Sequence, residues 1–365
     1  MQFLIFILLL PLFAYCYQII SWYLQWLHTA NFEMQEMSHV GISLIIPFKD
    51  EIDNLPSLIS SLENQSHANW ELILVNDHSE DGSFELARSL IENSHLNAQL
   101  INSDSNGKKA ALLTGVKSST HPIIVTSDAD CSYHPLWLIN IANACESKQA
   151  DLLILPVTIK RSKGWLNRFQ QIDFAAVQLS GAAAALQGKA IMCNGANLAC
   201  SKAAYLEAEL QTRIASGDDM FLLEWMKQNN KKIDFIKTDK VLVETKGADT
   251  LKSFLHQRAR WAAKAPHYKD KQIITIGIIV SSVNLVLIGS LMAGILAPTM
   301  WKIYGIVLFT KSICDYTLLK AGSNHYKFNI SFLEVLFWQA IYPLYVLIVL
   351  VYPLFVKVIW KSRTI

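Results

Sequence analysis

Hydrophobic residues follow two different patterns along this chain. Uncharged apolar runs occupy 3–27 and 273–296, and two apolar runs with a few charges occupy 300–319 and 330–360. A membrane-spanning helix needs about 20 such residues, which each run supplies. Between the first two runs, short apolar stretches alternate with polar segments, as they do in a globular domain. The pattern predicts a globular domain held between membrane segments at both ends.

The central segment alternates between strand and helix signals. Short β-branched runs predict strands at 41–48, 71–75, 99–102 and 122–126, and helical periodicity lies at 54–64, 84–93 and 109–118. This alternation predicts an α/β domain with a mostly parallel, doubly wound sheet. Ligands bind beyond the carboxyl ends of the strands in such sheets. Polar residues follow three of these strands, so we expect a site at that edge.

Composition and charge place the domain relative to the membrane. Hydrophobic residues make up 52% of the 365 residues, more than in most soluble chains. No basic residue precedes the first run, so an uncleaved anchor with an outside N-terminus is expected rather than a signal peptide. Basic residues crowd before the second run, which places the central domain in the cytoplasm. We expect an anchor at 1–28, a catalytic domain with interfacial helices at 29–270 and a membrane region at 271–365. No nucleic-acid partner is expected.

The side of the C-terminus stays open. One segment before the domain and three after it would place the C-terminus outside the cell. However, Lys357, Lys361 and Arg363 favour the cytoplasm. The third run carries Lys311 and Asp315, so it is either interfacial or re-entrant, or its charges face the interior of a helix bundle. The six cysteines show no metal-ligand spacing or disulfide framework.

Acidic residues follow the predicted strands. Asp128 and Asp130 flank one small residue, so both carboxylates could share a divalent cation with phosphate oxygens. The alternative is a solvated turn. Asp77 could hold a base or a ribose hydroxyl, as strand-end acids do in dinucleotide folds, or it could only form an Asx turn.

Three further clusters lie at predicted helix ends. Lys108 follows a glycine near a helix N-terminus, which suits a diphosphate, although a solvated lysine would look the same. Asp218 and Asp219 start an amphipathic helix, where one could act as a general base or both could only stabilise the helix end. The segment 257–261 (QRARW) lies just before the membrane. Snorkelling cations and a headgroup-level Trp would explain it without any catalytic role.

Taken together and in this order, the clusters resemble the motifs of the membrane-bound family 2 glycosyltransferases. This GT-A-fold family includes chitin, hyaluronan and cellulose synthases and ceramide glucosyltransferases. The resemblance covers about residues 41 to 265. The matching segments are 46–51 (IPFKDE), 76–82 (NDHSEDG), 106–108 (NGK), 128–130 (DAD), 195–197 (GAN), 218–219 (DD) and 257–261 (QRARW).

The resemblance implies a role for each matched residue. Contacts to the nucleotide sugar, expected to be a UDP-sugar, would come from Pro47, Glu51, Asp77, Lys108 and Asp128. Asp130, with Asp128, would hold Mn²⁺ or Mg²⁺, and Asp219 rather than Asp218 would be the catalytic base. Gln257, Arg260 and Trp261 match the Q-x-x-R-W motif, whose Trp would line the acceptor entrance.

The expected reaction is transfer of a sugar from a nucleotide sugar to an acceptor hydroxyl, with inversion at the sugar carbon. The acceptor is expected to be a lipid-linked or saccharide molecule at the membrane. Two alternatives stay open: a processive polysaccharide synthase, and a non-enzymatic assembly or transport subunit. Ser201 and Lys202 stand where chitin and hyaluronan synthases have an Arg pair, which favours single addition over polymerisation.

Overall fold

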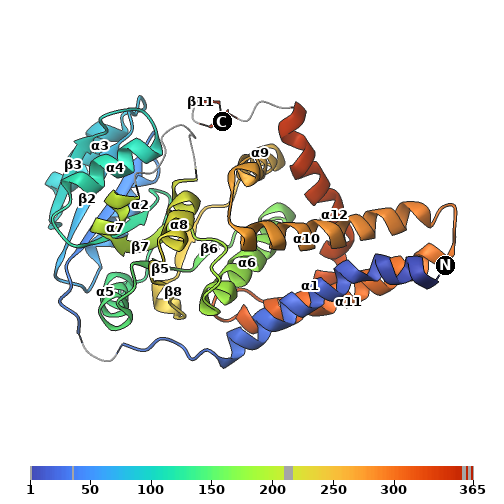
Figure 1. The fold of residues 1–365 in the computed structure, drawn as a ribbon. Helices are drawn as coiled ribbons and strands as arrows, with labels where there is room; N and C mark the ends of the chain where they lie inside the picture. The colour runs from blue at the N-terminus through green and yellow to red at the C-terminus, as the bar shows by residue number, and fades with distance from the viewer. Residues whose placement is uncertain (1, 35–36, 209–216, 356–358, 361–362, 365) are drawn as a thin grey trace. The chain divides into compact units, whose positions relative to one another are not determined.

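The computed structural model describes residues 2–34, 37–208, 217–355, 359–360 and 363–364. The chain forms two compact units (Figure 1). The sheet unit comprises 30–160 and 192–247. The helical unit comprises 1–29, 161–191 and 248–364. Residues 161–191 and 248–270, which belong to the catalytic domain expected at 29–270, thus group with the hydrophobic ends of the chain.

The sheet unit is built on a mixed sheet of seven strands in the order β3-β2-β1-β4-β7-β5-β8. The strands are β1 (Ile42–Phe48), β2 (Trp70–Asn76), β3 (Ala98–Asn102), β4 (Ile123–Ser127), β5 (Leu152–Ile154), β7 (Asn197–Ser201) and β8 (Ile233–Phe235). Strands β3, β2, β1 and β4 are parallel, as expected, but β7 runs antiparallel to β4 and β5. Two short strands, β6 (Val157–Ile159) and β9 (Val243–Thr245), pair separately.

Helices follow the parallel strands, as the alternation predicts. They are α2 (Leu55–Glu63), α3 (Ser83–Glu92), α4 (Lys108–Ser118) and α5 (Trp137–Lys148), with α7 (Lys202–Glu207), α8 (Asp218–Gln228) and the 3₁₀ turn η1 (Asp239–Val241) later in the chain. Every residue of β1 is buried, as expected of a central parallel strand covered on both faces. A close helix–sheet contact occurs at Gly115 of α4, where a Cβ would lie 2.5 Å from Cγ2 of Ile45.

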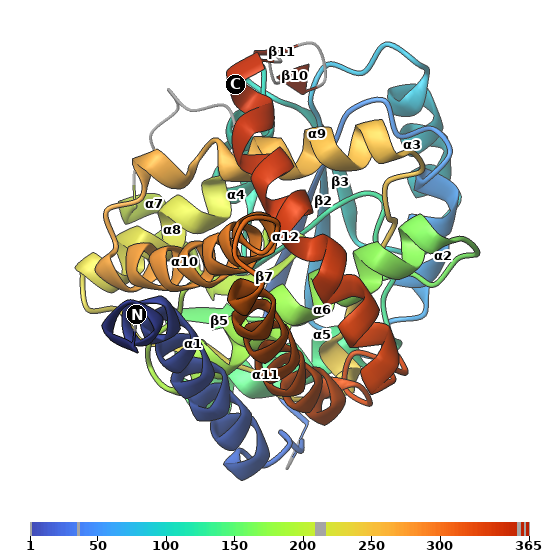
Figure 2. The ribbon, with the colours of Figure 1, turned by 90° about the vertical axis from the view of Figure 1, so that its right-hand side faces the viewer.

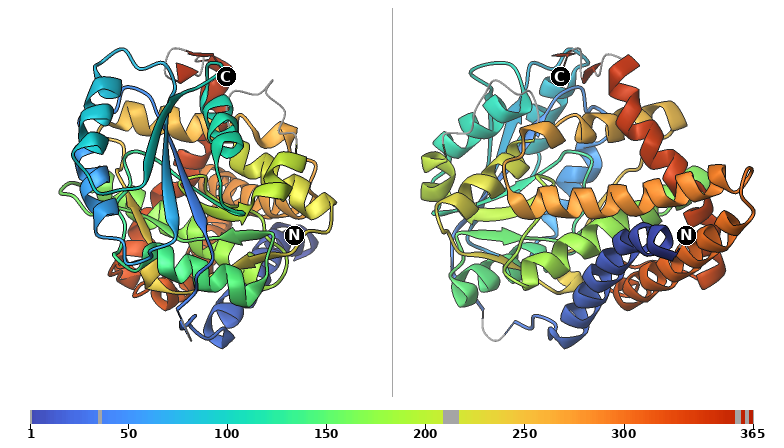
Figure 3. Two further views of the ribbon diagram at one scale, coloured as in Figure 1. Left: turned by 90° about the vertical axis from the view of Figure 1, so that its left-hand side faces the viewer. Right: turned by 45° about the vertical axis from the view of Figure 1, so that its right-hand side comes forward.

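The parallel register brings the strand ends to one edge of the sheet. Phe48, the last residue of β1, pairs with Asn76, the last residue of β2. Strand β4 also ends at this edge, with Ser127. The loops after these three strands carry the predicted acidic residues, so the sheet topology gathers them in one region. Figure 3 (left) shows the sheet with helices beside it.

The described residues of the helical unit form six helices of 12 residues or more. Figure 2 shows them, with the first helix of the chain in blue and the last three in orange to red. They are α1 (Gln2–His28), α6 (Trp165–Leu186), α9 (Leu251–Ala262), α10 (Lys271–Ala293), α11 (Thr299–Gly322) and α12 (Phe332–Phe355), joined by the 3₁₀ turn η2 (Ala265–His267) and followed by the short strands β10 (Ile359–Trp360) and β11 (Arg363–Thr364). Two segments among the described residues, Lys271–Ala293 and Phe332–Tyr352, are long and apolar enough to cross a membrane. The run 3–27 forms α1, and its role as an anchor stays a prediction.

Two of the charged residues of α11, Lys311 and Asp315, face the interior of the helical unit. Lys311 is 2% exposed, and its Nζ lies 2.7 Å from Oδ2 of Asp315 and 2.7 Å from Oε1 of Gln339 on α12. Tyr15 of α1 donates a 2.5 Å hydrogen bond to Oδ1 of Asp315. Of the alternatives for these charges, the structure supports the interior one. Lys357 and Lys361, together with the side chain of Arg363, lie outside the described part of the chain.

Candidate active site at the carboxyl edge of the sheet

The loops after β1 and β2 are joined by hydrogen bonds. The carboxylate of Asp81 accepts from the backbone amides of Ser83 and Ile52 and from the Ser83 hydroxyl. Burial alone would raise the pKa of Asp81, but these hydrogen bonds to its charged form lower that pKa. Ser83 Oγ also accepts from the amide of Glu51 at 2.8 Å. The N-D-x-S-x-D-G turn thus holds the loop that carries Glu51.

Asp77 follows β2 and is buried. Its Oδ1 accepts a 2.7 Å hydrogen bond from the amide of Gly107, the residue that precedes α4. Gly107 has φ of 118°, a conformation that only glycine adopts readily. Asp77 therefore fixes the N-terminal end of α4, whose first residue is Lys108. Pro47 is buried in β1, next to the loop that carries Glu51.

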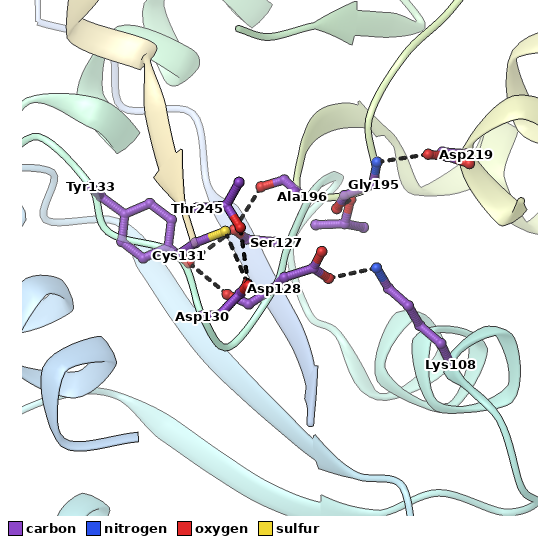
Figure 4. A network of polar contacts seen from close by, with 11 residues as sticks. Lys108, Ser127, Asp128, Asp130, Cys131, Tyr133, Gly195, Ala196, Asp219 and Thr245 are labelled. Carbon is purple, nitrogen blue, oxygen red and sulfur yellow. Dashed lines mark hydrogen bonds and ion pairs between the residues drawn. The ribbon is translucent and has the colours of Figure 1, made fainter. Parts of the chain in front are cut away.

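The D-x-D pair follows β4 and is held from three sides (Figure 4). Thr245 of β9 donates a 3.0 Å hydrogen bond to Oδ2 of Asp130. The amide of Ser132 donates to the carbonyl of Glu244 at 2.9 Å, which ties the loop to β9. Tyr133 stacks on Trp137 at 4.2 Å and donates to Ser127 Oγ at 2.9 Å. The turn is therefore a fixed element of the fold rather than a solvated loop.

The electrostatics of this pair suit a cation. Burial is the largest cause that raises the pKa of Asp130 to about 6, followed by the charge of Asp128. The charge of Glu51 acts in the same direction, while the Thr245 hydroxyl opposes it. Two carboxylates this close to each other resist being ionised at the same time. A nearby positive charge stabilises the form in which both are ionised.

Lys108 supplies one such charge. Its Nζ lies 2.5 Å from Oδ1 of Asp128. Burial would lower the pKa of Lys108, but Asp128, Asp218 and Asp219 together raise it above its usual range. Lys108 is therefore fully charged at neutral pH. Its ammonium lies near Asp128, which follows β4, and near the acid pair at the start of α8.

The acid pair at the start of α8 lies near Lys108, with Gly195 between them. The amide of Gly195 donates a 3.1 Å hydrogen bond to Oδ2 of Asp219, and the amide of Met220 donates to Oδ1 at 2.8 Å. A Cβ at Gly195 would lie 3.6 Å from both Asp218 Oδ2 and Lys108 Nζ. The structure therefore brings Lys108, Asp128, Asp130, Asp218 and Asp219 together at one edge of the sheet.

Thr245 was not singled out from the sequence, and Gly195 and Asn197 were named only as part of the matched segment 195–197. Thr245 contacts Asp130 across 115 positions of sequence, and Gly195 contacts Asp219 across 24. Asn197 of the G-x-N segment is fully buried. Its side chain accepts from Trp137 Nε1 and donates to the carbonyls of Pro156 and Val241. Asn197 therefore braces the fold, because its buried amide joins β7 to α5 and to the segments that carry Pro156 and Val241.

The Q-R-A-R-W segment belongs to α9 of the helical unit. Arg258, which the sequence suggested to be a snorkelling interfacial cation, is instead 6% exposed and lies 2.6 Å from Oδ2 of Asp173 on α6. Its guanidinium lies 4.5 Å from the ring centre of Trp261. That interpretation of Arg258 is wrong, because a buried acid and aromatic rings surround its head group. Gln257, Arg260 and Trp261 are partly exposed, and their roles stay predictions.

The comparison with protein families confirms the resemblance. Residues 43–208 match the model of the family described as "Glycosyl transferase family 2". The match covers a little under half of this chain and includes the D-x-D turn after β4.

Several curated proteins are similar over part of this domain. Glycosyltransferase AglE of Haloferax volcanii is 30% identical over 115 residues, which are 31% of this chain and 38% of that protein. The undecaprenyl-phosphate 4-deoxy-4-formamido-L-arabinose transferase of Aeromonas hydrophila is 35% identical over 99 residues, 26% of this chain and 30% of that protein. The dodecaprenyl-phosphate galacturonate synthase of Rhizobium johnstonii is 27% identical over 118 residues, 31% of this chain and 35% of that protein. The match spans little more than a third of each relative at most.

A solved structure shares the fold. It is a mannosyltransferase from Pyrobaculum calidifontis, in complex with GDP-mannose and Mn²⁺. The TM-score is 0.58 at 14% identity, covering 96% of this chain and 99% of that one. The expected GT-A fold class is thus confirmed.

Proposed function

We propose that this chain is a membrane-bound, inverting glycosyltransferase that moves a sugar from a nucleotide sugar to a lipid-linked acceptor. The observation that carries the proposal is the convergence of Lys108 with two acid pairs at the carboxyl edge of the sheet. One pair, Asp128 and Asp130, suits a metal and a diphosphate. The other pair, at the start of α8, suits a base.

The donor would be held from three loops. Asp77 fixes the start of α4 and would receive the base or ribose, as strand-end acids do. Pro47 and Glu51 would form the wall after β1. Lys108 and the N-terminal amides of α4 would face the diphosphate, because a helix N-terminus with a lysine favours an anion. The donor is expected to be a UDP-sugar, although the mannosyltransferase of similar fold was determined with GDP-mannose.

The donor set fits a hard divalent cation. No group of three or more metal-ligating side chains occurs among the described residues, so Asp128 and Asp130 would act with phosphate oxygens of the donor. Mg²⁺ is commonly bound by one or two carboxylates together with substrate phosphates, and Mn²⁺ prefers similar oxygen ligands. When bound, the metal neutralises charge that builds on the leaving diphosphate, an effect of several kcal/mol. Lys108 adds fixed positive charge at the same place.

The transfer itself would be a single displacement. The acceptor oxygen forms a bond to the sugar carbon while the bond from that carbon to the diphosphate breaks, with inversion. Asp219 would take the acceptor proton. Two backbone amides hold its carboxylate in place, which favours catalysis because the base needs no rearrangement to act.

A lipid phosphate is a second candidate acceptor, and the names of two relatives favour it. A phosphate oxygen is already ionised at neutral pH, so transfer to it needs no base. A hydroxyl acceptor does need one. The effect of Asp219→Asn on transfer therefore separates the two acceptor classes.

Membrane location and orientation belong to the same proposal. The enzyme would lie in the cell membrane as a multi-pass protein with its catalytic domain in the cytoplasm. An Asn93→Cys variant offers an exposed thiol on the sheet unit. In intact cells it should be protected from an impermeant maleimide, and ready labelling would reverse the orientation.

Metal dependence is the direct test of the site. UDP and GDP binding should be measured by calorimetry with and without Mn²⁺, in the wild type and in Asp130→Ala. We expect metal to strengthen binding in the wild type only. Equal affinity under all conditions would remove the metal role. A processive synthase would instead be recognised by long products, and a non-enzymatic subunit by the absence of any transfer.

A further inference from the structure

Helix α12 has two different faces. The exposed face is an apolar stripe of Leu333, Phe337, Ile341, Leu344 and Ile348. The opposite face packs against helices α6, α9, α10 and α11 of the same unit. By length and hydropathy alone, the segment Phe332–Tyr352 could cross a membrane. The contacts of the second face argue for a different placement.

Helix α6 packs against the first half of α12. Arg168 makes a two-pronged ion pair with Glu334, through Nε at 2.5 Å and a terminal nitrogen at 2.7 Å. Phe169 lies 5.0 Å from the ring of Trp338, and Asp173 accepts a 3.4 Å hydrogen bond from Tyr345. Glu334 to Tyr345 is about 16 Å of helix at 1.5 Å per residue.

Helix α9 packs against the second half of α12. Phe254 stacks on Tyr345 at 5.6 Å, and His256 lies 6.2 Å from Tyr352. Helices α6 and α9, which carry charged and polar side chains, thus contact α12 from its first turn to Tyr352. This length is about 27 Å in all. If α12 crossed a bilayer, the buried pair Asp173–Arg258, which lies beside its middle, would sit at hydrocarbon depth. Ionised groups are rare and costly there.

Resting on the membrane location proposed above, we infer that α12 lies along the membrane surface, with its apolar stripe against the acyl chains of the bilayer. A surface helix buries one apolar face and presents the other to protein or water. Helices α10 and α11 form a hairpin joined by residues 294–298, so both of its ends lie on the same side of the membrane. The segment after α12 then returns to the side from which α10 starts.

This placement resolves the conflict in the charge pattern. A C-terminus on the side of the catalytic domain puts Lys357, Lys361 and Arg363 where basic residues are retained. The result holds whether the α10–α11 hairpin crosses the bilayer or only dips into it.

Depth-dependent fluorescence quenching tests the inference in the full-length protein, reconstituted in phosphatidylcholine–phosphatidylglycerol vesicles. Cysteines at exposed positions 333 and 344 (Leu333→Cys, Leu344→Cys) would carry a bimane label, and lipids brominated at defined depths would quench it. A crossing helix places the two labels about 16 Å apart in depth. A surface helix places them at nearly the same shallow depth, which is the expected result.

Helix α10 supplies a matched control. Ile274 and Leu285 are also exposed and eleven positions apart, so Ile274→Cys and Leu285→Cys should report clearly different depths. A depth difference in α12 equal to that in α10 would overturn the inference. So would a C-terminal tag on the opposite side of the membrane from a label at Asn93→Cys. If no label in either helix is quenched, the membrane location itself fails, whereas loss of transfer with the expected depths rejects only the enzymatic proposal.

Discussion

The ammonium of Lys108 lies 2.5 Å from Oδ1 of Asp128, so the first residue of α4 is paired with the first acid after β4. This contact joins the lysine expected at the diphosphate to the acid expected at the metal. On the proposed function both groups would act on the same part of the donor, and removing either should change phosphate binding rather than base recognition.

Lys108→Met should weaken UDP binding about 10- to 100-fold in the presence of Mn²⁺, since hydrogen bonds to charged groups contribute about 1.5–3 kcal/mol. Binding of uridine, which has no phosphate, should stay unchanged. Calorimetry with both ligands measures the difference. An equal loss for uridine and UDP would show that Lys108 supports the fold of the site rather than the diphosphate.

Metal binding should depend on pH through Asp130. Its pKa is raised to about 6, first by burial and then by Asp128. Above pH 6 the carboxylate is ionised and free to bind Mn²⁺. As the pH falls below 6, protons compete for it, and the affinity should fall by roughly tenfold per unit until another ligand also protonates. Mn²⁺ titrations followed by electron paramagnetic resonance between pH 5 and 8 measure this. A flat profile from pH 7 to 5 would contradict the assignment.

The two acids at the start of α8 should differ in their effect on turnover. Asp219→Asn should keep donor affinity within a few fold but reduce transfer to a hydroxyl acceptor by at least about 100-fold, because general-base catalysis contributes about 10²–10⁴. Asp218→Asn should cost less, since Asn also serves well near a helix start. Donor affinity and turnover need to be measured in the same membrane preparation. An inactive Asp218→Asn with an active Asp219→Asn would reverse the assignment, and full transfer to a hydroxyl acceptor by both variants would reduce the motif to a helix start.

The contact between α4 and the sheet should be sensitive to a single methyl group. In Gly115→Ala, the new Cβ would lie 2.5 Å from Ile45 Cγ2 and 3.0 Å from Val75 Cγ2. Such overpacking costs about 1–3 kcal/mol of unfolding free energy. Lys117→Ala, exposed on the same helix, is the matched control and should change stability little. Equal thermal midpoints for the two variants would show that the helix moves away at no cost.

Much of the sheet unit could be predicted from its sequence because the signals there are local. The runs that form β1, β2 and β4 are apolar, and each ends at polar residues that the parallel register brings to one edge. Strand β7 gives a weaker signal, because NLACS contains no β-branched residue and its antiparallel partner β4 ends 70 positions earlier. Its direction depends on the chain's path through α6, which no local pattern specifies.

Tertiary contacts explain what the sequence missed in the site. Thr245 acts on Asp130 only because β9 passes beside the D-x-D turn. Arg258 looked like a surface cation because basic residues surround it in the sequence. In the fold, its position on α9 turns it toward Asp173 of α6 and away from water. Which face of a helix is buried depends on its neighbours, and those neighbours are far away in the sequence.

The central claim is that this chain transfers a sugar from a nucleotide donor, and sugar transfer tests it most directly. Purified full-length protein should be incubated with radiolabelled UDP- and GDP-sugars, membrane lipids and Mn²⁺, beside Asp130→Ala as a matched control. We predict that at least one donor labels the lipid fraction in the wild type, with that label lost in Asp130→Ala or when the metal is chelated. No transfer from any donor, or equal labelling by Asp130→Ala, would contradict the account.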